Sequence, residues 1–306
     1  MFRNVSSAVS YAIHKKLLIP RRKREWNLKD RAFVHTTSFG QKFELHPGEE
    51  IDKDIFVEGM YELRILRVIE RVFSRRPGSI MVDVGANIGN HAIYLSRYFD
   101  RIICFEPSPE IAARLKSNIK LNGITNIQVE NVGLSNRDAM MHFKLNKSGN
   151  LGASGFQAEA NAETIDLPVR KGDDCLSHVD RLDLLKVDVE EHELQVFQGL
   201  QKSISKYRPI ISFEFQGHVQ GVDGFNAIRK ALEDYIFVDI DFAPWSASQI
   251  QKLVWQVKRR GCPEFKRIDK PQPRFYSTIL AFPDDGAFEN FASAFNSPLS
   301  LYGERT

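Results

Sequence analysis

The chain has 306 residues, of which 42% are hydrophobic and 26% charged, a composition typical of a globular protein that excludes a disordered or fibrous chain. No apolar run approaches the ~20 residues needed to span a bilayer, so no transmembrane segment is predicted. The three cysteines are scattered without a CxxC pair, which argues against a disulfide scaffold or a zinc site and favours a cytoplasmic protein.

The net charge of +3 is unevenly distributed along the chain. Residues 1–31 carry nine Lys and Arg against Glu25 and Asp30, a balance of +7, which leaves −4 for the rest. This acidic body has no basic stripe interleaved with aromatic residues, so no nucleic-acid partner is predicted.

Residues 1–31 are predicted to form a basic amphipathic helix followed by a hinge. Apolar side chains recur there at helical spacing, and Pro20 is expected to end the pattern before the basic run 21–24. Two roles stay open for this segment. In the first, the helix packs its apolar stripe on the domain or on a second copy in a homodimer. In the second, it rests peripherally on the anionic inner membrane surface. The stripe consists of Val5, Val9, Ala12, Ile13 and Leu17.

Residues 32–78 are predicted to form a cap and a leading helix. Short alternating patches among Gly40, Pro47 and Gly48 favour a β-hairpin within 32–56. An apolar pattern of period 3.6 predicts one helix over 58–73, leading into the first strand of the core.

Residues 80–107 contain the most informative pattern in the chain. A strand around Asp83 ends in a Gly-rich loop, a helix is expected over 90–99, and a strand over 102–105 ends on Glu106 and Pro107. A strand, Gly loop, helix, strand and acid in this order are typical of a nucleotide-binding crossover.

The loop chemistry distinguishes between nucleotides. A dinucleotide fingerprint needs Gly where this chain has Asn87 and Asn90, because a pyrophosphate must approach bare backbone. Gly85 still permits the sharp turn, Gly89 permits close packing of helix on strand, and Glu106 is placed to accept hydrogen bonds from ribose hydroxyls. We therefore predict S-adenosylmethionine as the cofactor. An NAD-dependent oxidoreductase is the alternative.

The rest of the body alternates between strands and helices, which predicts an α/β doubly wound, mostly parallel sheet with helices on both faces. The cofactor domain is expected over 79–283, with a loose tail over 284–306. Residues 146–162 are interpreted either as a substrate-side lid or as a plain surface excursion. Strands are expected over 127–132, 140–145, 165–169, 183–189, 210–215, 237–242 and 275–282, and helices over 109–122, 194–200, 225–235 and 246–259.

Three motifs resemble the FkbM family of S-adenosylmethionine-dependent methyltransferases. They are Val82-Asp-Val-Gly-Ala-Asn-Ile-Gly89, Phe105-Glu-Pro107 and Lys186-Val-Asp-Val-Glu-Glu-His-Glu193, and the resemblance covers roughly residues 58–215. It implies a Rossmann-like class I methyltransferase sheet of seven strands, the last two forming an antiparallel pair at one edge. It also implies O-methylation of a hydroxyl on a sugar, glycoconjugate or natural-product small molecule. One departure is Glu191, where the family usually carries Gly.

The carboxyl ends of the parallel strands should meet around one crevice. The residues predicted to bind the cofactor there are Asp83, Gly85, Asn87, Gly89, Glu106, Pro107, Gly133, Leu134 and Ser135, the last three as a turn beside the adenine.

Methyl transfer to a hydroxyl also needs a group that removes the proton. Asp188 is the leading candidate, followed by Glu190, whose other interpretation is a salt bridge to Lys186 or a helix cap. His192 is the third candidate, and its competing interpretation is a surface histidine stabilised by the acids around it. Glu214 is predicted to bind substrate. The spacing matches no metal signature, so no metal is predicted. A domain that binds the cofactor without catalysis is the remaining alternative.

Overall fold

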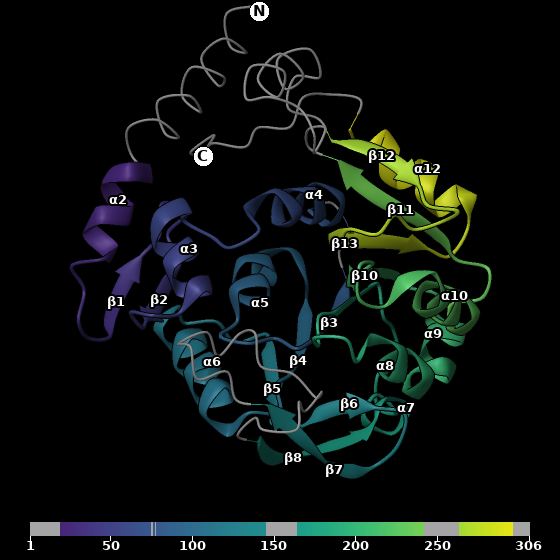
Figure 1. Cartoon of the computed structure of the whole chain (residues 1–306), viewed down its shortest axis with the longest axis horizontal. Helices are drawn as coiled ribbons and strands as arrows, with labels where there is room; N and C mark the ends of the chain where they lie inside the picture. The colour runs from purple at the N-terminus through teal and green to yellow at the C-terminus, as the bar shows by residue number, and fades with distance from the viewer. Residues whose placement is uncertain (1–18, 75, 77, 145–163, 242–262, 296–306) are drawn as a thin grey trace, which may run out of the picture.

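The computed structural model describes residues 19–74, 76, 78–144, 164–241 and 263–295. Its centre is an eight-stranded sheet in the order β12-β11-β13-β10-β9-β3-β4-β5 (Figure 1). The strands are β12 (Glu264–Arg267), β11 (Ile236–Asp241), β13 (Phe275–Phe282), β10 (Ile210–Gln216), β9 (Leu184–Val187), β3 (Ile80–Val84), β4 (Arg101–Phe105) and β5 (Ile127–Glu130).

The sheet is mostly parallel, as predicted. The five strands from β10 to β5 pair in parallel, and β13 lies antiparallel between β10 and β11. The predicted antiparallel pair of late strands is therefore confirmed. The expected number of seven was wrong by one, because the short strand β12 adds to β11 at the edge. The strand order reverses between β3 and β9, the place where open α/β sheets bind ligands.

Alternation along the strands produces two cores, one on each face of the sheet. On β4, Ile102 and Cys104 join one core, and Ile103 and Phe105 join the other. Helices cover both faces, as expected for a parallel sheet. The first core contains α3 (Glu50–Glu58), α4 (Leu63–Phe73), α5 (Asn90–Leu95), α6 (Pro109–Leu121) and α12 (Asp285–Ser293); the second contains α8 (Glu193–Gly199), α9 (Gln201–Tyr207) and α10 (Gly221–Ala231).

The cap before the sheet follows the prediction in part. Strands β1 (Phe33–Thr36) and β2 (Lys42–Leu45) form the expected antiparallel hairpin. The helix predicted over 58–73 is confirmed as α4, although it begins later, at Leu63. The residues before it form a separate helix, α3, which was not predicted. Gly59 ends α3 at φ +95°, where its N–H donates to the Ile55 carbonyl, and this left-handed backbone suits glycine.

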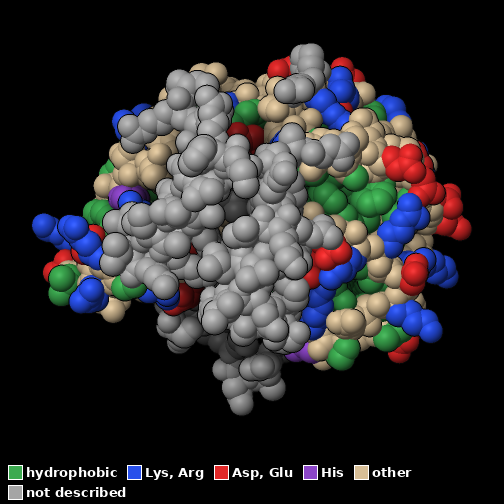
Figure 2. All heavy atoms as spheres, turned by 90° about the horizontal axis from the view of Figure 1, so that it is seen from above, with side chains coloured by type: hydrophobic (Ala, Val, Ile, Leu, Met, Phe, Trp, Pro, Cys, Tyr) green, Lys and Arg blue, Asp and Glu red, His purple; other side chains and the backbone are tan. Residues whose placement is uncertain are grey.

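The basic run lies on a helix and not in a hinge. Helix α2 (Ile19–Trp26) includes both Pro20 and the basic run, so Pro20 does not end the helical pattern before it. Arg21 pairs with Glu25, while Arg22 donates to the carbonyls of Phe56 and Val57 and so holds α2 against α3. Figure 2 shows Lys and Arg side chains gathered at the left edge of the molecule, the side on which α2 lies in Figure 1.

A second sheet in the order β6-β8-β7 flanks the main one. Its strands are β6 (Gly133–Ser135), β7 (Ala139–Lys144) and β8 (Thr164–Lys171), with α7 (Gly172–Cys175) after β8. The turn predicted at Gly133 to Ser135 was wrong: the segment is a strand paired in parallel with β8.

Helix α12, after β13, packs against the sheet. Helix α12 was expected to be part of a loose tail, but its Phe291 is buried against Phe282 and Phe265 at ring-centroid distances of 4.9 and 5.6 Å. Aromatic clustering of this kind fixes the helix on the sheet. The helix predicted over 246–259, the candidate lid over 146–162 and the apolar stripe of residues 5–17 lie outside the described residues. Among the described helices, none combines the length and apolarity of a membrane span.

Candidate active site

A cavity opens at the carboxyl ends of β3, β4, β9 and β10, at the reversal of strand order. Its volume is about 920 Å³ including the open mouth. Most of the predicted site residues line it: Gly85, Asn87, Glu106, Pro107, Gly133, Leu134, Asp188, Glu190 and Glu214. Four do not line it: Asp83, Gly89, Ser135 and His192.

The loop after β3 can be built only with glycine at its first position. Gly85 has φ +78°, and a Cβ added there would lie 1.9 Å from the carbonyl oxygen of Asp188. Gly89 has φ +90°, and its added Cβ would meet Leu115 of α6 at 2.4 Å. Gly85 therefore brings bare backbone to the cavity wall, whereas Gly89 allows the packing of helix on helix behind it.

Glu106 lies directly beside the Gly85 loop, just after β4. Its side chain accepts hydrogen bonds from the backbone N–H groups of Asn87 and Ser108, both at 3.0 Å. Burial raises the pKa of Glu106 to about 7, although these two donors act in the opposite direction. Additional donors from a ligand would stabilise the charged carboxylate, and two ribose hydroxyls are donors of this kind.

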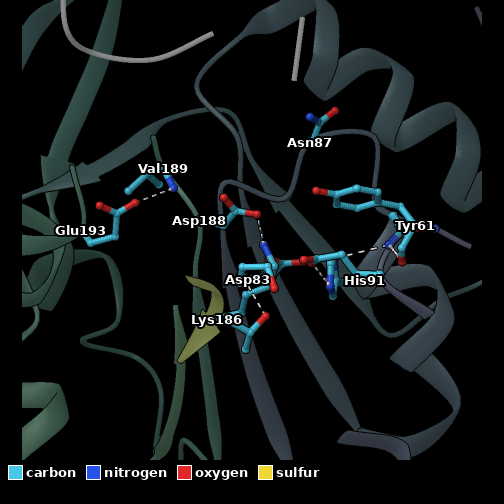
Figure 3. A network of polar contacts seen from close by, with 12 residues as sticks. Tyr61, Asp83, Asn87, His91, Lys186, Asp188, Val189 and Glu193 are labelled. Atoms are coloured by element: carbon cyan, nitrogen blue, oxygen red, sulfur yellow. Dashed lines mark hydrogen bonds and ion pairs between the residues drawn. The ribbon is translucent and has the colours of Figure 1, made fainter. Parts of the chain in front are cut away.

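Lys186 forms the floor of the cavity on β9. Its Nζ lies 3.4 Å from Asp83 Oδ1 and 3.2 Å from Asp188 Oδ2, as Figure 3 shows. Burial disfavours the charged amine, but Asp188 and Asp83 outweigh burial and raise the pKa of Lys186. Asp83 is fully buried beneath the cavity, so its predicted contact with the cofactor is replaced by this ion pair.

Two further carboxylates lie beside Asp188. The register pairs Phe213 of β10 with Val187 of β9, which places Glu214 and Asp188 next to each other one residue further on. The side-chain amide of Gln216 donates to Glu214 at 3.3 Å and to Glu190 at 3.5 Å. Burial, Asp188 and Glu191 raise the pKa of Glu190 to about 7. Burial and the neighbouring acids also raise the pKa of Glu214, more strongly.

The wall opposite the acids comes from the segment before α4, which the sequence analysis did not include in the site. Asn90 holds it by accepting from the Tyr61 N–H at 3.0 Å and donating to the Tyr61 carbonyl at 2.9 Å. His91 lies 3.3 Å from Glu62, and Tyr61 and His91 line the cavity. No local spacing links residues 61 and 90, since tertiary folding brings them together.

The prediction that His192 is a surface residue or a base was wrong on both counts in this structure. His192 is buried, and its Nε2 is hydrogen-bonded to Ser135 Oγ at 3.0 Å, away from the cavity. Burial and nearby Arg137 lower the pKa of His192 to about 4. Ser135 and His192 therefore join β6 to the start of α8 and contact no ligand site. Glu193, the next residue, is buried too and accepts from the Val189 N–H (Figure 3).

The turn after Asp188 is left-handed at two successive residues. Glu190 has φ +49° and Glu191 has φ +71°, a conformation that favours glycine. Glu191 thus adopts a left-handed backbone conformation that a glycine would adopt without strain.

We expect Glu191→Gly to raise the free energy of unfolding by about 0.5–1 kcal/mol, because glycine adopts this φ without strain. The measurement is a urea unfolding curve. Glu191→Ala serves as the control, since it removes the same charge and keeps the Cβ. Equal stabilisation by both variants would show that charge, and not backbone strain, is responsible.

Strand order, glycine loop and acid at the second strand together define a class I methyltransferase architecture. Residues 83–238 match the family described as the methyltransferase FkbM domain, and the chain belongs to this family of methyltransferases. The predicted resemblance is confirmed.

Individual relatives are distant. Methyltransferase 1 of Beauveria bassiana is 28% identical over 175 residues, covering 50% of this chain and 67% of its own length. Hexuronic acid methyltransferase AglP of Haloferax volcanii is 27% identical over 162 residues, covering 51% of this chain and 66% of its own length. The crystal structure of an FkbM methyltransferase from Methylobacillus flagellatus is 20% identical with a TM-score of 0.42, and the match covers 69% of this chain and 47% of that one.

Proposed function

We propose that this protein transfers a methyl group from S-adenosylmethionine to a hydroxyl of a sugar, glycoconjugate or natural-product small molecule. The observation that supports it most is the pairing of a bare-backbone loop at Gly85 with a buried carboxylate at Glu106 in one cavity. Family membership supports methyl transfer over the hydride transfer of an NAD enzyme.

The residues present fit this cofactor. Glu106 would accept hydrogen bonds from the ribose hydroxyls, and the Gly85 loop would lie against the amino-acid end. Leu134 and Pro107 offer apolar surface for the adenine, beside the backbone of Gly133. When bound, S-adenosylmethionine supplies a methyl group on a cationic sulfur, and its transfer leaves a neutral thioether and one proton from the hydroxyl.

Glu190 is the group we assign to take that proton. Asp188, ranked first from the sequence, is engaged in an ion pair with the Lys186 amine at 3.2 Å. Glu190 lines the same cavity, and each group that shifts its pKa raises it, to about 7. A base works best when its pKa lies near the operating pH. We therefore propose Glu190 as the base, Asp188 as its positioning neighbour and Glu214 as a substrate contact.

A glycan acceptor is supported by one relative, whose name assigns it a hexuronic acid. Both a sugar and a natural product offer a hydroxyl that could lie between Tyr61 and the acids of β9 and β10. Polar groups on both walls suit an acceptor rich in hydroxyls.

The proposal predicts that S-adenosylhomocysteine binds to the purified protein and that NAD does not, as measured by isothermal titration. Glu106→Ala should weaken this binding about 100-fold, because it removes two charge-assisted hydrogen bonds to the ribose. Glu110→Ala, which removes an acid from the first turn of α6 at an exposed position, should leave the affinity unchanged. Absence of heat with S-adenosylhomocysteine would overturn the proposed function.

A further inference from the structure

Three carboxylates lie together on one wall of the cavity. Asp188, Glu190 and Glu214 come from the ends of two adjacent strands, which lie about 4.8 Å apart. Within the described part of the chain, the basic side chain beside these carboxylates is that of Lys186. It is buried and lies against both Asp83 and Asp188. Glu190 and Glu214 share the amide of Gln216, a neutral group that does not compensate their charge.

Like charges this close cannot all ionise in a partly buried site. The groups that face them add to the repulsion: Glu191 acts on Glu190, and Glu193 acts on Glu214. On the opposite wall Tyr61 is uncharged, and His91 lies against Glu62. Near neutral pH the cluster therefore holds protons that a bound positive charge would displace.

We infer that the cluster of Asp188, Glu190 and Glu214 exchanges a proton for the positive charge of the cofactor, so that the cavity prefers cationic S-adenosylmethionine to its neutral product. This inference rests on the proposed function, since it concerns the same cofactor. It goes further by assigning these residues a role in releasing the product.

The number of protons on the cluster is restored over the reaction. The cluster loses a proton when the cation binds, and it recovers one from the acceptor hydroxyl when the methyl group moves and the sulfur becomes neutral. The product then faces a wall that is neutralised by protons and no longer attracts it. Loss of this attraction lowers the affinity for the product relative to the cofactor and favours its departure.

The test is isothermal titration at neutral pH in two buffers of different ionisation enthalpy, which gives the number of protons released. The probes are S-adenosylmethionine, S-adenosylhomocysteine and sinefungin, an analogue with an amine in place of the methyl-bearing sulfur. We expect the two cationic probes to release about one proton more than S-adenosylhomocysteine and to bind about tenfold more tightly.

Glu214→Gln should reduce both differences, and Glu110→Gln, a change of the same kind at an exposed site, should preserve them. Removing a repelled carboxylate relieves strain, so the variant is expected to fold, which a thermal melt verifies. Equal proton release by all three probes, or release unaffected by Glu214→Gln, would overturn the inference while leaving the cofactor in place. If none of the three probes bound, the proposed function itself would fail.

Discussion

Replacing Glu190 by Gln is expected to lower kcat about 10²–10⁴-fold, the usual contribution of a general base. The amide keeps the size of the side chain and its place on the cavity wall but cannot accept the proton of a hydroxyl. Affinity for S-adenosylhomocysteine should change far less, because Glu190 is not part of the ribose contact. The measurement is methyl transfer to the hydroxyl acceptor at saturating cofactor.

The pH profile identifies the group responsible. Burial and neighbouring acids raise the pKa of Glu190 to about 7, and a base acts in its deprotonated form. The kcat/KM of the native enzyme for the cofactor, which reports groups of the free enzyme, should therefore rise as the pH rises through about 7, and Glu190→Gln should lose this rise. The control Glu110→Gln removes an acid at an exposed position outside the cavity lining, and it should retain both rate and profile. A Glu190→Gln enzyme with native rate and profile would exclude Glu190 as the base.

Much of the fold could be predicted because it depends on local rules. Nearly continuous apolar runs identified the buried parallel strands, and Ser108 with Pro109 identified the start of α6, where the Ser108 hydroxyl accepts from the Ile111 N–H. The side strand β12 could not be predicted in this way. It has four residues, and its existence depends on the free edge of β11.

The candidate site, too, was predictable where it depends on local rules and unpredictable where it depends on tertiary packing. Residues at strand ends, such as Glu106 and Glu214, were predictable, because parallel strands deliver their carboxyl ends to one edge. Periodicity also placed Lys186, Asp188 and Glu190 on the same side of one strand. It could not say which carboxylate would lie against the lysine, since that depends on distances of a few ångströms set by tertiary packing.

For His192, the local sequence led to a wrong prediction of exposure. Four acids within six residues suggested an exposed and charged histidine, yet its surroundings are set by β6, more than fifty residues away. Gly199 of α8 allows this approach, because a Cβ there would lie 1.9 Å from the Ser135 carbonyl oxygen. The helix therefore lies directly on β6, and the histidine at its start is buried. In the sequence, Gly199 is the residue that indicates this contact, because glycine permits a close approach of backbone.

Replacing Lys186 by Met is expected to lower the free energy of unfolding by about 3–5 kcal/mol, the cost of removing one partner from a buried ion pair. Asp83 is fully buried, and neither of its carboxylate oxygens accepts a hydrogen bond from the described residues. Lys186 Nζ is the positive charge within ion-pair distance of it in the described part of the chain. A domain stability of 5–15 kcal/mol would leave this variant close to unfolding.

The double variant Asp83→Asn with Lys186→Met separates charge from packing. It removes the stranded carboxylate along with the amine, so it should recover a large part of the lost stability, and the cycle should give a coupling of about 1–3 kcal/mol. Urea unfolding of the four proteins is the measurement. Additive effects would show that Lys186 acts mainly through Asp188 at the cavity floor. Strong coupling would show that the ion pair beneath the Gly85 loop supports the cofactor wall, since Asp83 and Gly85 belong to one strand and its loop.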